Sequence, residues 1–235
     1  LRQLFATEPG RAQRFSAKAC GIYLDYSKNL LDEQSWQTLQ QLAAQSTIRQ
    51  LGQQMQAGAA INNTEQRAVW HTRLRQQNLT NLQLDGEDIG AAILDCRQKM
   101  AALIEQLHNQ RYLGYQGKPI TDLVWVGIGG SLLGPQMAVE ALTPYHCSPV
   151  KLHFAGNIDG AVVSDITKQL DPATTLVVVA SKSFGTEETK QNALAVRQWF
   201  KDHGADAAAI ARHFWATSSN IAAAAEFGIV EQNIL

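Results

Sequence analysis

Four side chains suited to binding an anion stand close together in the second half of the chain. Ser181, Lys182, Ser183 and Thr186 follow directly after the apolar run TTLVVVA, and they supply three hydroxyl groups and one ammonium group. A phosphate is bound well by several short-range hydrogen-bond donors in a positive field. The stretch 181–189 therefore predicts a phosphate-binding loop, to which the N-terminus of a following helix would add its own N–H groups.

A second candidate loop, GIGGSLLGP, occupies residues 127–135. Gly129 and Gly130 allow the backbone to approach a ligand closely, and a helix that begins near Ser131 would direct free N–H groups outward. The sequence does not match a dinucleotide fingerprint, because Leu132 stands where the third glycine or alanine belongs. It does not match a P-loop or a nucleophile elbow either, because both patterns are broken within the next three residues. What remains is a turn that presents backbone donors to a ligand.

Each loop also has a purely structural explanation. Hydroxyl side chains commonly cap helices, glycines tighten turns, and Glu187 and Glu188 are ordinary partners for the positive end of a helix dipole. The same carboxylates would repel a phosphate bound beside them, so at least one is expected to face away or to pair with a cation. The presence of two such loops on neighbouring strand ends favours the binding interpretation.

Four short apolar runs predict the strands that position these loops. They begin near residues 123, 151, 174 and 212, and each is followed by small or polar residues and then a helical stretch. Continuous apolar strands that alternate with helices indicate a parallel sheet covered on both faces. We therefore expect an α/β domain with a doubly wound, flavodoxin-like parallel sheet over residues 112–235. Ligands of such sheets bind at the carboxyl ends of the strands, where both loops fall.

The first part of the chain, residues 1–111, is predicted to be a helical region. The apolar spacing at 31–45 and 91–107 matches one face of a helix. The stretch 62–75 opens with asparagine and threonine before a helix-forming run, and Asn63 and Gln66 have the spacing of a weak capping box. These patterns predict three helices and little strand.

Composition excludes several kinds of partner. The net charge of −1 comes from 20 basic and 21 acidic residues with no blocks of one sign, which argues against nucleic acid and against an anionic membrane surface. No apolar stretch approaches the roughly 20 residues that span a bilayer. The three cysteines are scattered and the six histidines lack ligand spacing, so we expect a cytoplasmic protein without a metal.

Six segments, taken in order, resemble the glucose-6-phosphate isomerase family of the sugar isomerase (SIS) superfamily. The likeness runs from about residue 4 to the C-terminus. The segments are LDYSKNLL (24–31), INNTEQRAVWHTRLR (61–75), VGIGGSLLGP (126–135), HFAGNIDG (153–160), ASKSFGTEETKQNA (180–193) and AEFGI (225–229).

The resemblance implies reversible isomerisation of glucose 6-phosphate and fructose 6-phosphate, a step of glycolysis and gluconeogenesis, by a cytoplasmic homodimer without a cofactor. It also implies a role for each of seven residues. The phosphate is held by Ser181, Lys182, Ser183 and Thr186, the sugar lies near Gly130 and Ser131, and a catalytic histidine is supported by Glu188.

Three positions depart from the family pattern. Ser183 replaces a usual threonine and keeps the hydroxyl, Gly185 replaces another and loses a side chain, and Leu132 stands where many members have aspartate. The family's principal acid–base residues belong to motifs beyond the segment GIVEQNIL, and His71 and His153 are expected to be structural. The resemblance thus implies a chain that binds sugar phosphate without turning it over.

Two other functions are weighed against this one. A complete, non-catalytic SIS module that senses a sugar phosphate is the alternative, which the isomerase-like helical region disfavours because it contains no DNA-reading element. A nucleotide-dependent oxidoreductase is disfavoured by the missing third glycine of the fingerprint.

Overall fold

A computed structural model describes residues 1–235, and the chain divides into two compact units. One comprises Leu1–Thr80 with Leu84–Glu87, and the other comprises Asn81–Gln83 with Asp88–Leu235. The division falls in a short hairpin of β3 (Gln83–Leu84) and β4 (Glu87–Asp88). No helix has the length and apolar character that crossing a membrane requires.

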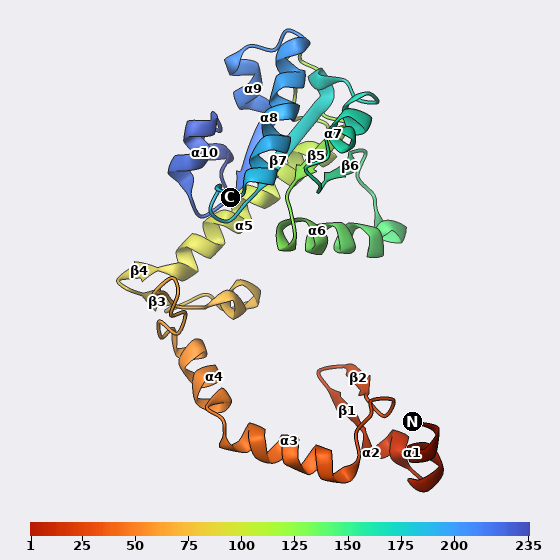
Figure 1. Ribbon diagram of the computed structural model, residues 1–235. Coiled ribbons are helices and arrows are strands. Elements are labelled where there is room, and N and C mark those ends of the chain that lie inside the picture. Colours follow the sequence, from red (N-terminus) through yellow and green to blue (C-terminus); the bar gives the residue numbers. More distant parts are fainter. The chain divides into compact units, whose positions relative to one another are not determined.

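The second unit is built around a parallel sheet (Figure 1). Its helices and strands alternate along the chain, as the apolar runs predict. In order they are α5 (Ile89–His108), β5 (Asp122–Val126), α6 (Gly130–Ala141), η2 (Thr143–Tyr145), β6 (Lys151–Ala155), α7 (Gly160–Thr167), η3 (Pro172–Thr174), β7 (Thr175–Ala180), α8 (Glu187–Asp202), α9 (Ala207–His213), β8 (Phe214–Thr217), α10 (Ile221–Phe227) and η4 (Glu231–Asn233).

The strand order β6-β5-β7-β8 confirms the predicted doubly wound sheet. All three pairings are parallel, and β5 lies between β6 and β7. The chain passes from β5 to β6 on one side, and then crosses to β7 on the other side. The direction of winding therefore reverses between β5 and β7, which is the point where such sheets bind their ligands.

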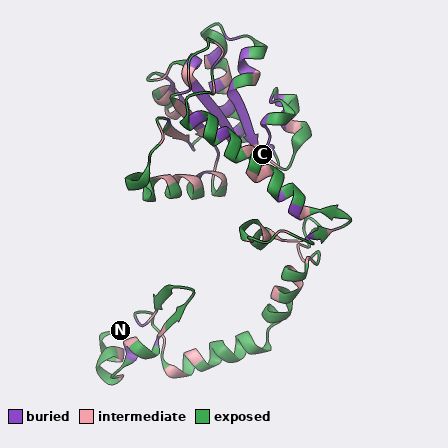
Figure 2. Cartoon of the chain, turned by 180° about the vertical axis from the view of Figure 1, so that it is seen from behind, coloured by how far each residue is buried: buried purple, intermediate pink, exposed green.

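Helices cover both faces of this sheet, and β7 and β8 are the most deeply buried of its strands (Figure 2). All six residues of β7 are buried. On one face Val177 and Val179 pack in a cluster that includes residues of α7 and α8, and on the other Leu176 and Val178 pack in a cluster that includes Leu107 of α5. A β-branched run buried on both sides explains why this strand shows no polar alternation.

Helix α5 therefore packs against the sheet, although its position in the sequence predicted that it belongs with the preceding helices. Its bounds agree with the predicted helix at 91–107, and Asp88 caps it by accepting a hydrogen bond from the Ala91 amide over 3.0 Å. The boundary between domains at residues 111 and 112 stays a prediction.

The first unit has short elements and few buried residues. The predicted helix at 31–45 is confirmed as α3, which Asp32 caps through the Ser35 amide over 2.8 Å. The elements are α1 (Arg2–Thr7), α2 (Arg11–Arg14), β1 (Ser16–Ala19), β2 (Ile22–Asp25), α3 (Glu33–Gln45), α4 (Ile48–Ala57) and η1 (His71–Arg75).

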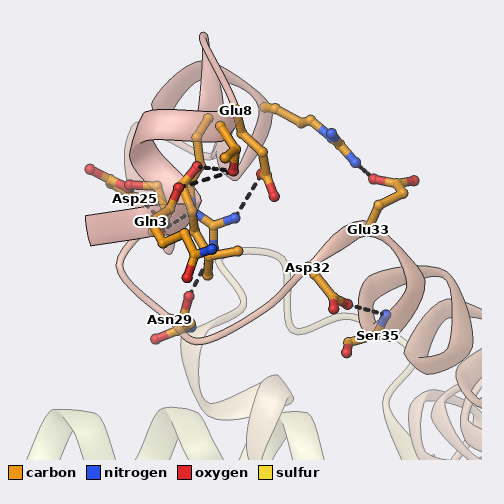
Figure 3. Close-up of polar contacts among 12 residues, drawn as sticks. Gln3, Glu8, Asp25, Asn29, Asp32, Glu33 and Ser35 are labelled. Atoms are coloured by element: carbon orange, nitrogen blue, oxygen red, sulfur yellow. Dashed lines mark hydrogen bonds and ion pairs between the residues drawn. The ribbon is translucent and has the colours of Figure 1, made fainter. Parts of the chain in front are cut away.

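Arg11 organises the N-terminal part of this unit, and two of its partners, Glu8 and Asn29, are labelled in Figure 3. Its side chain is fully buried, and it donates over 2.8 Å to each of three acceptors, the Ser27 carbonyl, the Asn29 carbonyl and the Glu8 carboxylate. The guanidinium carbon also lies 4.5 Å from the centre of the Phe15 ring. A buried charge is tolerated here because every side of the planar group has a partner.

Two features of this unit differ from the sequence-based expectation. The stretch 62–75 is not one helix, because the Asn62 side chain accepts hydrogen bonds from the Thr64 and Glu65 amides and Gln66 has φ 51°, so that only η1 remains helical. The antiparallel hairpin β1–β2 is also unexpected. Its two linking residues, at positions 20 and 21, both have positive φ, as a tight hairpin turn requires.

Candidate anion-binding site

The two loops singled out in the sequence begin at neighbouring strand ends. Val126, the last residue of β5, pairs in parallel with Val179 of β7, so the carboxyl ends of both strands lie at the same edge. The loops also approach closely at Gly127, where a Cβ atom would lie 2.9 Å from the Ser131 carbonyl oxygen and 3.3 Å from that of Ala180. Only glycine fits between these two backbone segments.

The loop after β7 is anchored by its one large apolar residue. Phe184 is buried and packs edge-on against Phe227, with ring centres 5.7 Å apart. Its amide donates to the Ser181 carbonyl over 3.2 Å, and its φ of 54° turns the chain sharply. Because Phe184 points into the core, Ser183 and Thr186 on either side of it lie at the surface.

The hydroxyl groups of this loop make few hydrogen bonds to the rest of the protein. Thr186 immediately precedes α8, yet its side chain caps none of the helix amides. The Thr186 hydroxyl oxygen lies 3.5 Å from that of Ser181, and the Ser183 hydroxyl oxygen accepts a hydrogen bond from the Gly185 amide over 3.3 Å. The Ser183 hydroxyl therefore keeps its proton for another acceptor. Capping does not explain why Thr186 carries a hydroxyl.

Charged groups flank the same loop. Lys182 is exposed, and α8 begins with the exposed residues Glu187 and Glu188. Glu187 accepts a hydrogen bond from Gln191 one turn along the helix, so its carboxylate is directed along α8. The expected repulsion of an anion is reduced in this way for one of the two carboxylates. The role of Glu188 toward a catalytic histidine stays a prediction.

The glycine loop after β5 starts helix α6 with an unusual backbone conformation. Gly129 has φ 57° and ψ −124°, which side chains other than hydrogen do not tolerate. Helix α6 begins at Gly130, and the carbonyl of its second residue, Ser131, accepts a hydrogen bond from the Trp125 indole over 2.8 Å. Leu132 turns inward, since a Cβ atom on Gly156 would lie only 2.1 Å from one of its methyl groups. The departure at Leu132 is therefore accommodated by packing.

Two histidines of the second unit, His153 and His213, contact strand residues at the end of the sheet opposite these loops. His153 on β6 lies 2.8 Å from the Asp122 carboxylate on β5. His213 is fully buried, where it lies 2.6 Å from the Thr175 carbonyl and accepts from the Tyr115 amide over 2.9 Å. Both Asp122 and Thr175 are the first residues of their strands, at the end opposite the loops.

A third loop, residues 218–220, lies at the same edge of the sheet and was not predicted from the sequence. Ser218, Ser219 and Asn220 follow β8 and donate hydrogen bonds to the backbone of the loop after β7. The sequence contains a signal for this loop, because small polar residues follow the apolar run of β8 as they follow the other three apolar runs. The sequence alone does not show that β8 lies next to β7.

The chain is a doubly wound α/β protein, a class that binds ligands at the reversal point of the sheet, where helix N-termini are suited to anionic groups. The family model of phosphoglucose isomerase matches residues 25–235, and the chain belongs to this family. The resemblance found in the sequence is thereby confirmed.

Individual relatives agree with this assignment. The chain is 45% identical over 234 residues to a glucose-6-phosphate isomerase of Shewanella pealeana, and 45% identical over 229 residues to one of Francisella philomiragia. It spans 43% and 42% of the lengths of these relatives. A crystal structure of a glucose-6-phosphate isomerase from Chlamydia trachomatis matches 90% of this chain and 40% of its own, with a TM-score of 0.72 and 28% identity.

Proposed function

We propose that the protein to which this chain belongs interconverts glucose 6-phosphate and fructose 6-phosphate without a cofactor, and that residues 1–235 supply its phosphate-binding part. One observation carries the proposal: in a chain of the phosphoglucose isomerase family, a loop rich in hydroxyl groups joins the N-terminus of α8 at the point where the sheet reverses. A regulatory module that only binds a sugar phosphate has no observation of its own in its favour.

The loop after β7 grips the phosphate in this proposal. The hydroxyls of Ser181, Ser183 and Thr186 donate hydrogen bonds, and the Lys182 ammonium offsets the charge of the dianion. The first amides of α8, a helix of 16 residues, add donors and a positive partial charge. Each of these groups acts at short range, so together they bind the ligand by its phosphate whatever the form of its sugar.

The glycine loop places the sugar. Gly130 and Ser131 lie at the start of α6, across the reversal point from the phosphate loop. A Cβ atom on Gly130 would meet nothing within 4 Å, so the space beside this residue is open. We assign that space to the sugar of the bound substrate.

The chemical step needs groups beyond these. Moving a proton between C1 and C2 requires a positioned base, and opening the sugar ring requires an acid–base pair. We assign these groups to the part of the family's sequence that this chain does not span, with Glu188 positioning a histidine. The whole enzyme is proposed to be a cytoplasmic homodimer, with residues 112–235 as its SIS-type sugar-phosphate-binding domain.

A binding experiment tests the proposal on the chain itself. Glucose 6-phosphate titrated into ¹⁵N-labelled protein is expected to shift the amides of Ser183 and Thr186, whereas glucose should not. The double variant Lys182→Met/Ser183→Ala should weaken binding roughly 30-fold or more, because it removes one charge-assisted donor and one neutral donor. Purified chain from a host without its own isomerase should give no fructose 6-phosphate. Shifts that appear equally with glucose, or measurable turnover, would contradict the proposal.

A further inference from the structure

The loop after β8 binds one carbonyl of the phosphate loop with three donors. Strand β8 pairs with β7 on the side away from β5. The Ser219 amide and hydroxyl donate to the Lys182 carbonyl over 3.0 and 2.8 Å, and the Ser218 hydroxyl donates to the same oxygen over 3.1 Å. A carbonyl oxygen has two lone pairs, so three donors fully satisfy it. This is more than a turn needs for its own closure.

The next carbonyl is bound by the same loop through an amide side chain that is itself fixed at both ends. Asn220 Nδ2 donates to the Ser183 carbonyl over 3.0 Å. The Oδ1 atom of Asn220 accepts from the Ala223 amide over 3.1 Å, which caps α10. The start of α10 therefore sets the direction in which this donor points.

These bonds determine which way the peptide units of the phosphate loop face. The chain has no cis peptide bond, and the C=O and N–H of a trans peptide point in opposite directions. Because the Lys182 carbonyl points toward the loop after β8, the N–H of Ser183 in the same unit points away from β8. That is the side on which β5 and its glycine loop lie. The carbonyl oxygens, which would repel an anion, face the other way.

We propose that Ser218, Ser219 and Asn220 are positioning residues for the substrate phosphate. They do not touch the ligand. They hold the carbonyls of Lys182 and Ser183 away from it, and so present the Ser183 amide to it. This inference rests on the proposed phosphate site, and adds to that site a set of residues from a third strand end.

Two variants separate this role from simple folding. Ser219→Ala removes one hydroxyl donor but keeps the backbone bond to Lys182, and Asn220→Asp keeps the acceptor that caps α10 but removes the donor to Ser183. Titrated with inorganic phosphate and with glucose 6-phosphate, Ser219→Ala should raise both dissociation constants roughly fivefold, and Asn220→Asp roughly tenfold or more, since it also adds a negative charge. The phosphate-induced shift of the Ser183 amide should shrink in both.

Rescue and a matched control complete the test. Ser219→Thr retains the hydroxyl and should bind as the unaltered chain does. Thr174→Ala removes an equivalent bond, from hydroxyl to the Asp171 carbonyl over 3.2 Å, beside the opposite end of β7, and should leave binding unchanged. If the unaltered chain binds phosphate while Ser219→Ala and Asn220→Asp bind it equally well, the positioning role is wrong and the phosphate site stands. If the unaltered chain binds neither ligand at this loop, both proposals fail.

Discussion

Gly129 and Gly130 are adjacent in the sequence, but they have different roles in the structure. Gly129 combines φ 57° with ψ −124°, a conformation reserved for glycine. Gly130 has no positive φ, and its missing side chain leaves open space. The first glycine is needed to build the turn, whereas the second is proposed to leave room for the sugar.

Alanine substitutions should separate these two roles. We expect Gly129→Ala to lower the free energy of unfolding of the second unit by about 1–3 kcal/mol, because alanine is strained in this conformation. Gly130→Ala should change it by less than about 1 kcal/mol, since the residue is helical and uncrowded. Urea titration followed by tryptophan fluorescence measures both. Equal losses would show that the conformation of Gly129 is not the cause.

His213 makes the stability of the second unit depend on pH. Burial lowers its pKa; the hydrogen bond to Thr175 opposes this effect and the charge of Arg212 adds to it. Because Nε2 accepts from the Tyr115 amide, Nδ1 must carry the proton that it donates to Thr175, and the neutral ring satisfies both bonds.

The direction of the pH effect follows from this lowered pKa. Below the unfolded-state pKa of about 6.5 the unfolded chain binds a proton that the folded chain resists, so stability falls as the pH drops from 7.5 to 5.5. The slope from this group is at most about 1.4 kcal/mol per pH unit. His213→Asn, which keeps a donor for Thr175, should show a smaller loss over this range in urea unfolding. An unchanged slope in the variant would contradict the assignment.

At the scale of elements, α6 shows how a helix can contain proline without breaking. Pro135 lies in the middle of the helix and has no N–H to donate to the Ser131 carbonyl four residues earlier. The Trp125 indole on β5 donates to that carbonyl instead, over 2.8 Å. The same bond ties the glycine loop to the strand before it.

Replacing this tryptophan should loosen the first turn of α6. We expect Trp125→Phe to cost about 1–2 kcal/mol, because the Ser131 carbonyl loses its donor. Hydrogen exchange measured by mass spectrometry should become faster in peptides covering residues 127–135. Trp215→Phe is the matched control, since it removes an indole bond to the Tyr112 hydroxyl elsewhere in the unit. Faster exchange at 127–135 in both variants would indicate general destabilisation instead.

At the scale of the whole chain, stability is divided between two units with separate buried residues. In the first unit the interior is built around Arg11 and its three acceptors. In the second it is built around the apolar sheet. A change in one interior is therefore expected to act mainly within its own unit.

Arg11→Lys tests this division. An ammonium group cannot reproduce the planar fork that reaches Ser27, Asn29 and Glu8, so we expect a loss of about 3 kcal/mol in the first unit. Amide exchange should accelerate in the N-terminal peptides and stay unchanged in the strands of the sheet. Arg14→Lys is the control, because Arg14 is half exposed and pairs with Glu33 at the surface, where an ion pair contributes under about 1 kcal/mol.

Local features of this protein could be read from its sequence. Apolar runs and helical spacing predicted β5 to β8 and helices α3, α5, α6, α7 and α8, because burial on both faces of a parallel sheet leaves a continuous apolar signal. The loops after β5 and β7 could likewise be chosen by residue type. The prediction of a helix over residues 62–75 was wrong, because the side chain of Asn62 competes for backbone amides there.

Contacts between distant residues could not be predicted in this way. Ser219 reaches the carbonyl of Lys182 across 37 residues, and Arg11 reaches that of Asn29 across 18, only because folding brings their elements together. Residue types and periodicity report what a segment buries, but not which neighbour it receives. The order of the strands places the loop after β8 against the loop after β7, and so determines the direction in which the Ser183 amide faces.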